Sequence, residues 1–198
     1  MSSLTNVVGS YGAGYMFYNC TNLETIDCRS LETVNAQYGI SSLCNKCKKL
    51  VSADFRSLKL VANNYTIQGI FNECSALTSV NLSSLETVSG TSCMQSIFYY
   101  CTSLESIDLS SLTSITGTSA ASGMCSGCTK LFSIDLSSLT SAAGANVFSS
   151  AFSNCTNLVD IDLSSLTSLT ESSATANMFQ KCTSLEKIYF PMLSGIPL

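Results

Sequence analysis

Residues 101–115 read CTSLESIDLSSLTSI, and close copies of this stretch recur along the whole chain. Seven cysteines place the copies in register, each 27 residues from the next: Cys20, Cys47, Cys74, Cys101, Cys128, Cys155 and Cys182. Counting from each cysteine as position 0, positions +3 and +11 are always leucine, +6, +8 and +14 are apolar, and +24 is phenylalanine or cysteine. A unit of this size buries its apolar side only against neighbouring units, so the repeat predicts a solenoid.

The apolar spacing inside the unit predicts short strands joined by turns. Ile107, Asp108 and Leu109 alternate inward and outward, as in a half-exposed strand. The last part of each unit leads up to the next cysteine and favours a short helical turn. In residues 176–182, for example, phenylalanine and cysteine are three residues apart. We therefore expect a leucine-rich-repeat solenoid with a 27-residue repeat. Short parallel β-strands would form one face, with short helical or 3-10 turns and loops opposite.

The order of the apolar residues also resembles a known family, the BspA-like leucine-rich repeats of bacterial surface proteins. Two copies carry this resemblance most clearly: Phe98, Cys101, Leu104, Ile107 and Leu109, and Phe152, Cys155, Leu158, Ile161 and Leu163. The unit departs from the family in two ways, because leucine at +11 replaces the asparagine of the commonest leucine-rich repeats and because the unit is longer than usual. The resemblance implies a curved, right-handed solenoid on a cell surface, adhesion or ligand binding as the usual role, and no catalytic residues.

The repeat predicts a single domain over residues 1–198, with a partial first repeat at 1–19, seven units from Cys20 and a truncated last coil at 182–198. Pro191 and Pro197 discourage further strand pairing there. Leu4 and Val7 fit positions +11 and +14, so the chain begins inside a repeat, and we expect further repeats or a capping domain at this end. The chain shows no signal peptide and no long apolar run. It is therefore expected not to insert into a membrane, and to be extracellular or on a cell surface through a longer parent chain.

Composition argues against several classes of function. Charged residues make up 11% of the chain and its net charge is -4, which argues against nucleic-acid binding. Histidine is absent, which excludes a Ser-His-Asp triad, a Cys-His pair and a histidine-ligated zinc site. The repeated positions are also interchangeable, so we expect a protein that is not an enzyme and has no catalytic residues, cofactor or metal site.

Position +7 holds the best candidates for a function, because its side chains are expected to point outward from the strands. They are Asp27, Asp54, Asn81, Asp108, Asp135 and Asp162. Neighbouring carboxylates at this spacing repel each other by about 1 kcal/mol even in water. Two explanations stay open. In the first, serine hydroxyls and turn amides hold each carboxylate, and duplication of the unit then copied the aspartate. In the second, the row binds a ligand or a cation, above all Ca²⁺. Arg29 and Arg56 at position +9 belong to the same face.

Three further patterns have both a structural and a functional explanation. Residues 44–47 and 125–128 have the C-x-x-C spacing of zinc and redox sites, but Cys44 and Cys125 stand where other units have phenylalanine, which favours core packing. A basic cluster on the first two coils is either a dock for an acidic partner or a solvated surface. It consists of Arg29, Lys46, Lys48, Lys49, Arg56 and Lys59. The tyrosines favour the N-terminal half and are expected to pack on the back of the coils.

The predicted function is non-catalytic binding or adhesion, with the Ser/Asp-rich strand face presented to a protein or glycan partner. The alternative is a structural spacer or assembly module of a larger cell-surface or viral-particle protein.

Overall fold

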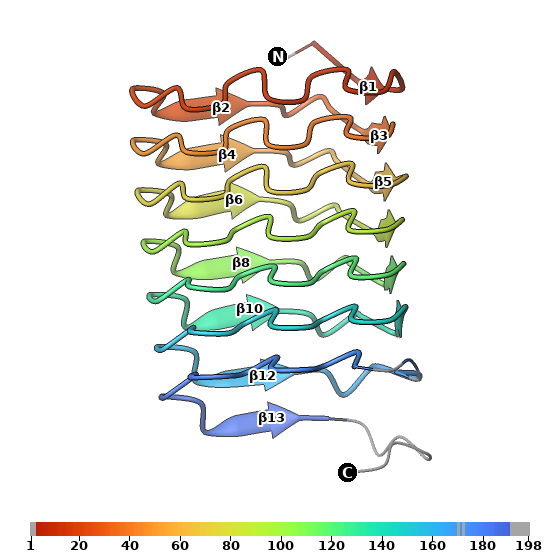
Figure 1. Ribbon diagram of the computed structural model, residues 1–198, viewed down its shortest axis with the longest axis vertical. Helices are drawn as coiled ribbons and strands as arrows, with labels where there is room; N and C mark the ends of the chain where they lie inside the picture. Colours follow the sequence, from red (N-terminus) through yellow and green to blue (C-terminus); the bar gives the residue numbers. More distant parts are fainter. Residues whose placement is uncertain (1–2, 170, 172, 191–198) are drawn as a thin grey trace.

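The chain forms a stack of coils along one axis, from β1 (Asn6–Val7) at one end to β13 (Lys187–Tyr189) at the other (Figure 1). The structure is a computed structural model, and it describes residues 3–169, 171 and 173–190. Its strand pairs are parallel and join residues one repeat apart, such as Ile107 and Ile134. The predicted solenoid is therefore confirmed. The expectations for Pro191, Pro197 and the end of the last coil lie outside the described residues, and the division into repeats stays a prediction.

Two parallel sheets run along the stack. The first sheet occupies positions +5 to +7 of five units, and a separate pair of strands occupies the same positions in the last two units. Its strands are β2 (Thr25–Asp27), β4 (Ser52–Asp54), β6 (Ser79–Asn81), β8 (Ser106–Asp108) and β10 (Ser133–Asp135), then the pair β12 (Asp160–Asp162) and β13 (Lys187–Tyr189). The second sheet occupies positions +13 to +15. It contains β1 (Asn6–Val7), β3 (Thr33–Asn35), β5 (Leu60–Ala62), β7 (Thr87–Ser89), β9 (Ser114–Thr116) and β11 (Ser141–Ala143).

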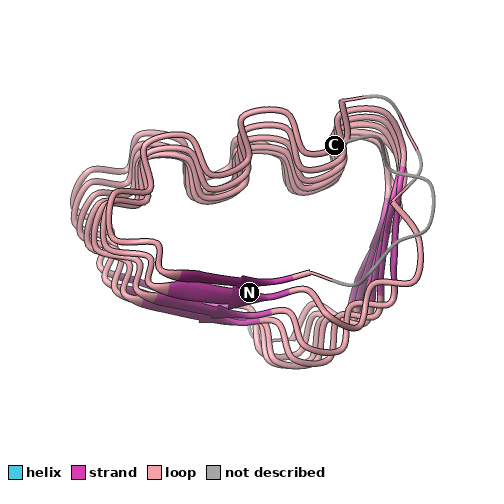
Figure 2. Cartoon of the chain, turned by 90° about the horizontal axis from the view of Figure 1, so that it is seen from below, coloured by secondary structure: helices cyan, strands magenta, loops and turns pink. Residues whose placement is uncertain are grey.

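The second sheet adds a strand face to the one that we expected. Ile115 is buried between Ser114 and Thr116, so this strand has the same outward-inward-outward pattern as Ser106, Ile107 and Asp108. Both strands are three residues long, because the inward residue is followed by a corner. Seen end-on, each coil therefore has two strand sides and one wavy side (Figure 2).

The wavy side is a series of tight turns, and no residue in the described part of the chain is helical. The expected helical turns are thus not confirmed. In the second coil the residues with positive φ are Tyr38 (55°), Ser42 (53°) and Lys46 (64°), four residues apart. A helix cannot continue through such residues. Two kinds of hydrogen bond alternate here in place of those of a helix. Leu43 N–H donates to Ile40 O within a turn at 3.2 Å, and the N–H of the next residue, Cys44, donates to Ile70 O in the neighbouring coil.

The core fills the space between these three sides. Leu104 at +3 and Leu112 at +11 have no exposed surface. Each such burial contributes about 2 kcal/mol relative to an exposed side chain. Phe71 and Phe98 stack across neighbouring coils with 5.7 Å between their ring centroids. The apolar positions of the repeat therefore form continuous columns, as the sequence predicts.

Candidate binding face

Each of the six aspartate and asparagine side chains at position +7 accepts a hydrogen bond from the backbone N–H two residues later, just after its strand. Asp108 Oδ1 accepts bonds from the backbone N–H of Ser110 at 3.0 Å and from its hydroxyl at 2.7 Å. Asp135 has the same two bonds from Ser137. A carboxylate that takes up the N–H at the end of a short strand stabilises the turn that follows. The structural explanation for this row, serine hydroxyls and turn amides, is thus present in the molecule.

The first two coils differ, because arginine replaces serine at +9. Arg29 donates from Nε and Nη2 to Asp27 Oδ2, at 2.9 and 2.6 Å. Arg56 makes the same bidentate pair with Asp54, with its Nε 2.9 Å from Oδ2. The hydrogen bonds from Arg29 lower the pKa of Asp27 to about 2, and those from Arg56 lower the pKa of Asp54. Both pairs are therefore fully ionised at neutral pH.

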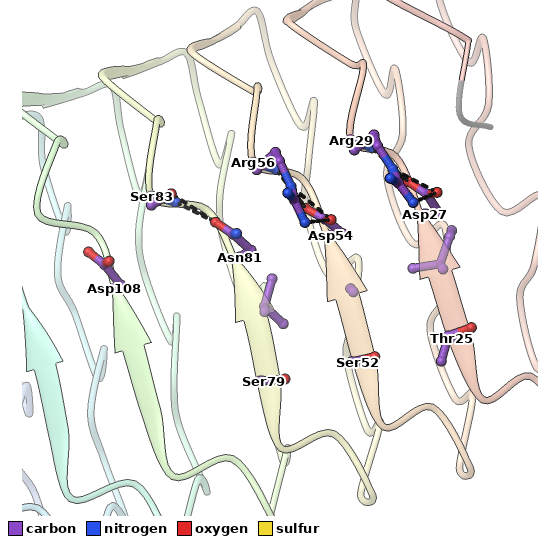
Figure 3. A pocket seen from close by; sticks show the side chains of 13 residues that line it. Thr25, Asp27, Arg29, Ser52, Asp54, Arg56, Ser79, Asn81, Ser83 and Asp108 are labelled. Atoms are coloured by element: carbon purple, nitrogen blue, oxygen red, sulfur yellow. Dashed lines mark hydrogen bonds and ion pairs between the residues drawn. The ribbon is translucent and has the colours of Figure 1, made fainter.

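A shallow groove of about 540 Å³ crosses the strands at these pairs (Figure 3). The small hydroxyl residues Thr25, Ser52 and Ser79 line it on the side opposite Asp27, Asp54 and Asn81. Along one side it has the Asp-Arg pairs of β2 and β4, and then Asn81 with Ser83. The groove extends to Asp108 at its far end. It is polar, open and elongated rather than enclosed.

The predicted site residues are thus divided by the structure. The groove brings six of them together: Asp27, Arg29, Asp54, Arg56, Asn81 and Asp108. Asp135 and Asp162 stand on β10 and β12, farther along the stack, and do not line it. In the described part of the chain, no three histidine, cysteine, aspartate or glutamate side chains are placed to hold a metal ion. No such cluster in the described residues therefore supports the explanation of the aspartate row as a Ca²⁺ site.

The C-x-x-C motifs belong to the core. Cys44, Cys47, Cys125 and Cys128 are buried, and none of them forms a disulfide. Burial raises the pKa of Cys74 to about 12, and it also raises those of Cys44 and Cys125. Thiols of this kind are neither deprotonated nor accessible at neutral pH. The position of these cysteines agrees with the packing explanation.

Three of the six basic side chains in the cluster form an ion pair with a carboxylate. Lys48 Nζ lies 3.0 Å from Glu73 Oε2, and Lys46 Nζ lies 5.8 Å from the centre of the Tyr18 ring. Arg29 and Arg56 are the members of the cluster that pair with aspartate. This arrangement offers specific ion pairs rather than a broad positive surface.

Three tyrosines form a stack on the outside of the wavy side, whereas the sequence predicts only that tyrosines pack on the back of the coils. The rings of Tyr11 and Tyr38 are 4.7 Å apart and those of Tyr38 and Tyr65 are 4.8 Å apart, nearly parallel in both cases. Tyr11 is 60% exposed, so this stack covers the coils from outside instead of packing into the core. The signal was available, because the three tyrosines all occupy position +18.

The family described as BspA type leucine rich repeat region matches residues 51–151 and 95–196, which together make up more than half of the chain. The chain belongs to the BspA-type leucine-rich repeat family. No helix in the described part of this BspA-type chain is long and apolar enough to cross a membrane.

Solved structures similar to this BspA-type chain are also leucine-rich repeat proteins. A T. pallidum leucine rich repeat protein is 18% identical, with a TM-score of 0.43, covering 78% of this chain and 72% of its own. A leucine-rich repeat protein from Bacteroides ovatus is 24% identical (TM-score 0.34; 90% of this chain, 52% of its own). A leucine rich cell surface protein from Faecalibacterium prausnitzii is 19% identical (TM-score 0.32; 91% and 62%). The chain thus spans less than two thirds of the last two. No curated protein matches it.

Proposed function

We propose that this BspA-type chain is a non-catalytic binding module, and that the strand-face groove between β2 and Asp108 receives an exposed polar segment of a partner protein. The observation that carries the proposal is the pair of bidentate Asp-Arg contacts in a groove that small hydroxyl side chains also line. The residues around the groove offer hydrogen-bond donors and acceptors over three neighbouring strands. An extended polar chain needs such a row of partners.

The arginines favour a protein segment as the ligand. A guanidinium carries five N–H donors in one plane, and Asp27 takes up the one on Nε and one of the two on Nη2 of Arg29. The two donors on Nη1 lie outside that pair and match a carboxylate or a peptide carbonyl. Because Asp27 and Asp54 hold the guanidinium groups in place, less side-chain freedom is lost on binding. This groove is open and polar, whereas small-molecule sites are mostly enclosed and apolar.

Family membership supports a wider setting for the binding module, and that setting is part of the proposal. Leucine-rich repeats are commonly protein-interaction modules, and one similar structure is described as a cell surface protein. We propose adhesion at a cell surface as the role, with this chain as the segment that contacts the partner.

The test fills the groove. Ser79→Tyr places a large side chain in the lining of the groove, and Ser133→Tyr places the same side chain at the same repeat position on β10, outside the groove. Binding of the wild type and both variants to a panel of purified extracellular proteins is measured by biolayer interferometry. Loss of a wild-type interaction by about tenfold or more in Ser79→Tyr, with Ser133→Tyr close to wild type, supports the proposal. Equal binding by both variants contradicts it.

One observation favours the alternative role as a spacer or assembly module. Met16 is 53% exposed and Cys20 is exposed, whereas the residues at the same positions in the second coil, Leu43 and Cys47, are fully buried. Apolar surface of this kind is what a further coil would cover. In this alternative, Met16→Glu changes the mass of the particle in analytical ultracentrifugation, and Ser79→Tyr does not.

A further inference from the structure

A second depression lies away from the strand face, where the wavy side turns into the first sheet. This corner pocket has a volume of about 360 Å³ and spans three coils. It is lined by Lys48, Glu73, Ser75, Tyr99, Tyr100 and Thr102. None of these residues lines the strand-face groove.

The aromatic wall of the corner pocket is held in a defined position. Tyr99 and Tyr100 meet edge to face, with 4.6 Å between their ring centroids and 72° between their planes. On its other side Tyr100 lies against Gly127 of the next coil, where an added Cβ would come within 3.0 Å of the ring. Gly127 has a φ of 80°, so glycine also suits the backbone there. Tyr100 nevertheless stays 47% exposed and offers ring surface to a ligand.

The polar wall offers a donor and an acceptor next to each other. Lys48 Nζ and Glu73 Oε2 form an ion pair at 3.0 Å, and both side chains keep more than a third of their surface exposed. The hydroxyl residues Ser75 and Thr102 complete the lining. Because the two charges compensate each other, the pocket has no net charge, which favours an uncharged ligand with several hydroxyl groups.

The combination occurs once in the chain. Two adjacent tyrosines stand at +25 and +26 only in Tyr99-Tyr100, and the next coil has Ser126-Gly127 at these positions. The aspartates at +7 recur from unit to unit, so duplication alone can explain them. It cannot explain a tyrosine pair, a glycine that makes room for it and an ion pair that converge from three different units.

We infer that the corner pocket binds a neutral pyranose ring of a glycan. One face of a pyranose consists of C–H groups and packs on an aromatic ring such as Tyr100. Its neighbouring hydroxyls both donate and accept hydrogen bonds, and bonds to charged partners such as Glu73 and Lys48 are the stronger ones. The inference concerns a site separate from the proposed strand-face site and adds a second class of ligand.

The experiment measures sugar binding by ligand-observed saturation-transfer NMR. The probes are the methyl pyranosides of glucose, galactose, mannose and N-acetylglucosamine, added to the full chain. For one ring on an open site we expect a Kd of about 1 mM for at least one probe. Tyr100→Ala weakens the binding of that probe by about tenfold or more. Tyr100→Phe changes its Kd by less than about twofold, because the aromatic ring makes the contact.

Further variants separate the pocket from the rest of the surface. Glu73→Gln keeps the shape and weakens binding by about threefold to tenfold, because a charged acceptor becomes a neutral one. Gly127→Ala displaces the Tyr100 ring and weakens binding in the same direction. Tyr15→Ala removes an equally exposed tyrosine outside the pocket and leaves binding unchanged.

Two results would overturn the inference: no probe binds the wild type, or binding survives Tyr100→Ala and is lost in Arg56→Ala. The first result leaves the strand-face proposal standing, since Arg29 and Arg56 lie outside the corner pocket. Circular dichroism and thermal melting of each variant confirm that the solenoid is intact.

Discussion

The Sγ atom of Cys101 lies 3.0 Å from the carbonyl oxygen of Phe71 in the preceding coil. The same contact recurs along the stack. It joins Cys47 to Phe17, Cys74 to Cys44, Cys128 to Phe98, Cys155 to Cys125 and Cys182 to Phe152. Cysteine at position 0 is therefore a buried residue that also donates a hydrogen bond between coils. An alanine would leave part of this space empty and would remove the S–H bond, while the Phe71 carbonyl would keep the bond from the Cys74 N–H.

Replacing this cysteine is expected to destabilise the stack. Cys101→Ala removes the S–H donor and leaves a small cavity, at a cost of about 1 to 2 kcal/mol in the free energy of unfolding. Urea denaturation measures the change. Cys20→Ala is the matched control at the same repeat position, because Cys20 is exposed and its loss should cost less than about 0.5 kcal/mol. Equal effects of the two substitutions would contradict the role of the contact.

The Asp27-Arg29 pair predicts a specific dependence on pH. The pKa of Asp27 is lowered from 3.8 to about 2 by the hydrogen bonds from Arg29, so the stabilisation is present above pH 3.8 and is lost as the pH falls toward 2. Arg29→Ala should raise the pKa of Asp27 back toward its ordinary value, as followed by NMR titration of the carboxyl carbon. Arg56→Ala should leave the pKa of Asp27 low, because Arg56 pairs with Asp54. An unchanged pKa in Arg29→Ala would show that the pair does not form in solution.

The corner that follows the second sheet depends on glycine. Gly117 has a φ of 122°, and an added Cβ would lie 2.4 Å from the carbonyl oxygen of Gly90 in the preceding coil. Gly117→Ala should therefore destabilise the protein by about 3 kcal/mol, measured by urea denaturation. At Gly9 an added Cβ meets no atom within 4 Å, and Gly9→Ala should change the stability by less than about 0.5 kcal/mol. A tolerated Gly117→Ala would mean that the coils do not approach each other this closely.

Thiol accessibility separates the packing explanation of the C-x-x-C motifs from a metal or redox site. In the native protein a thiol reagent should modify Cys20 quickly, and the buried Cys44 and Cys125 only after denaturation. Mass spectrometry of the modified peptides gives the order of reaction. Zinc bound in equal molar amount to the protein, and lost in Cys44→Ser, would contradict the packing explanation.

The sequence predicts the strand face well because a strand has a period of two. Ile107 inward and Asp108 outward can be read directly from the repeat, and the columns follow from the fixed spacing. The wavy side could not be predicted in this way. Phe71 and Cys74 are both buried and three residues apart, which fits a helix as well as a turn of four residues. The helix and the turn differ in the positive φ of residues such as Glu73. Glutamate is not a residue type that indicates a positive φ.

The candidate site was predicted in part for a similar reason. Position +7 faces outward in every coil, so Asp135 was as good a candidate as Asp27. The groove depends on the residue at +9 as well, and arginine stands there only in the first two coils. The repeat pattern does not predict the corner pocket, because its residues come from neighbouring units and Lys48, Glu73 and Tyr100 occupy positions where the repeat varies.

The most direct measurement removes the two arginines of the groove. Arg29→Ala combined with Arg56→Ala takes away two positive charges from the strand face, and Lys49→Ala with Lys130→Ala takes away two elsewhere on the exposed surface. Biolayer interferometry compares both double variants with the wild type, against the extracellular proteins that bind the wild type. We predict at least about tenfold weaker binding for the arginine variant and a change within about twofold for the lysine variant. Equal binding by the arginine variant and the wild type would contradict the strand-face groove as the binding site.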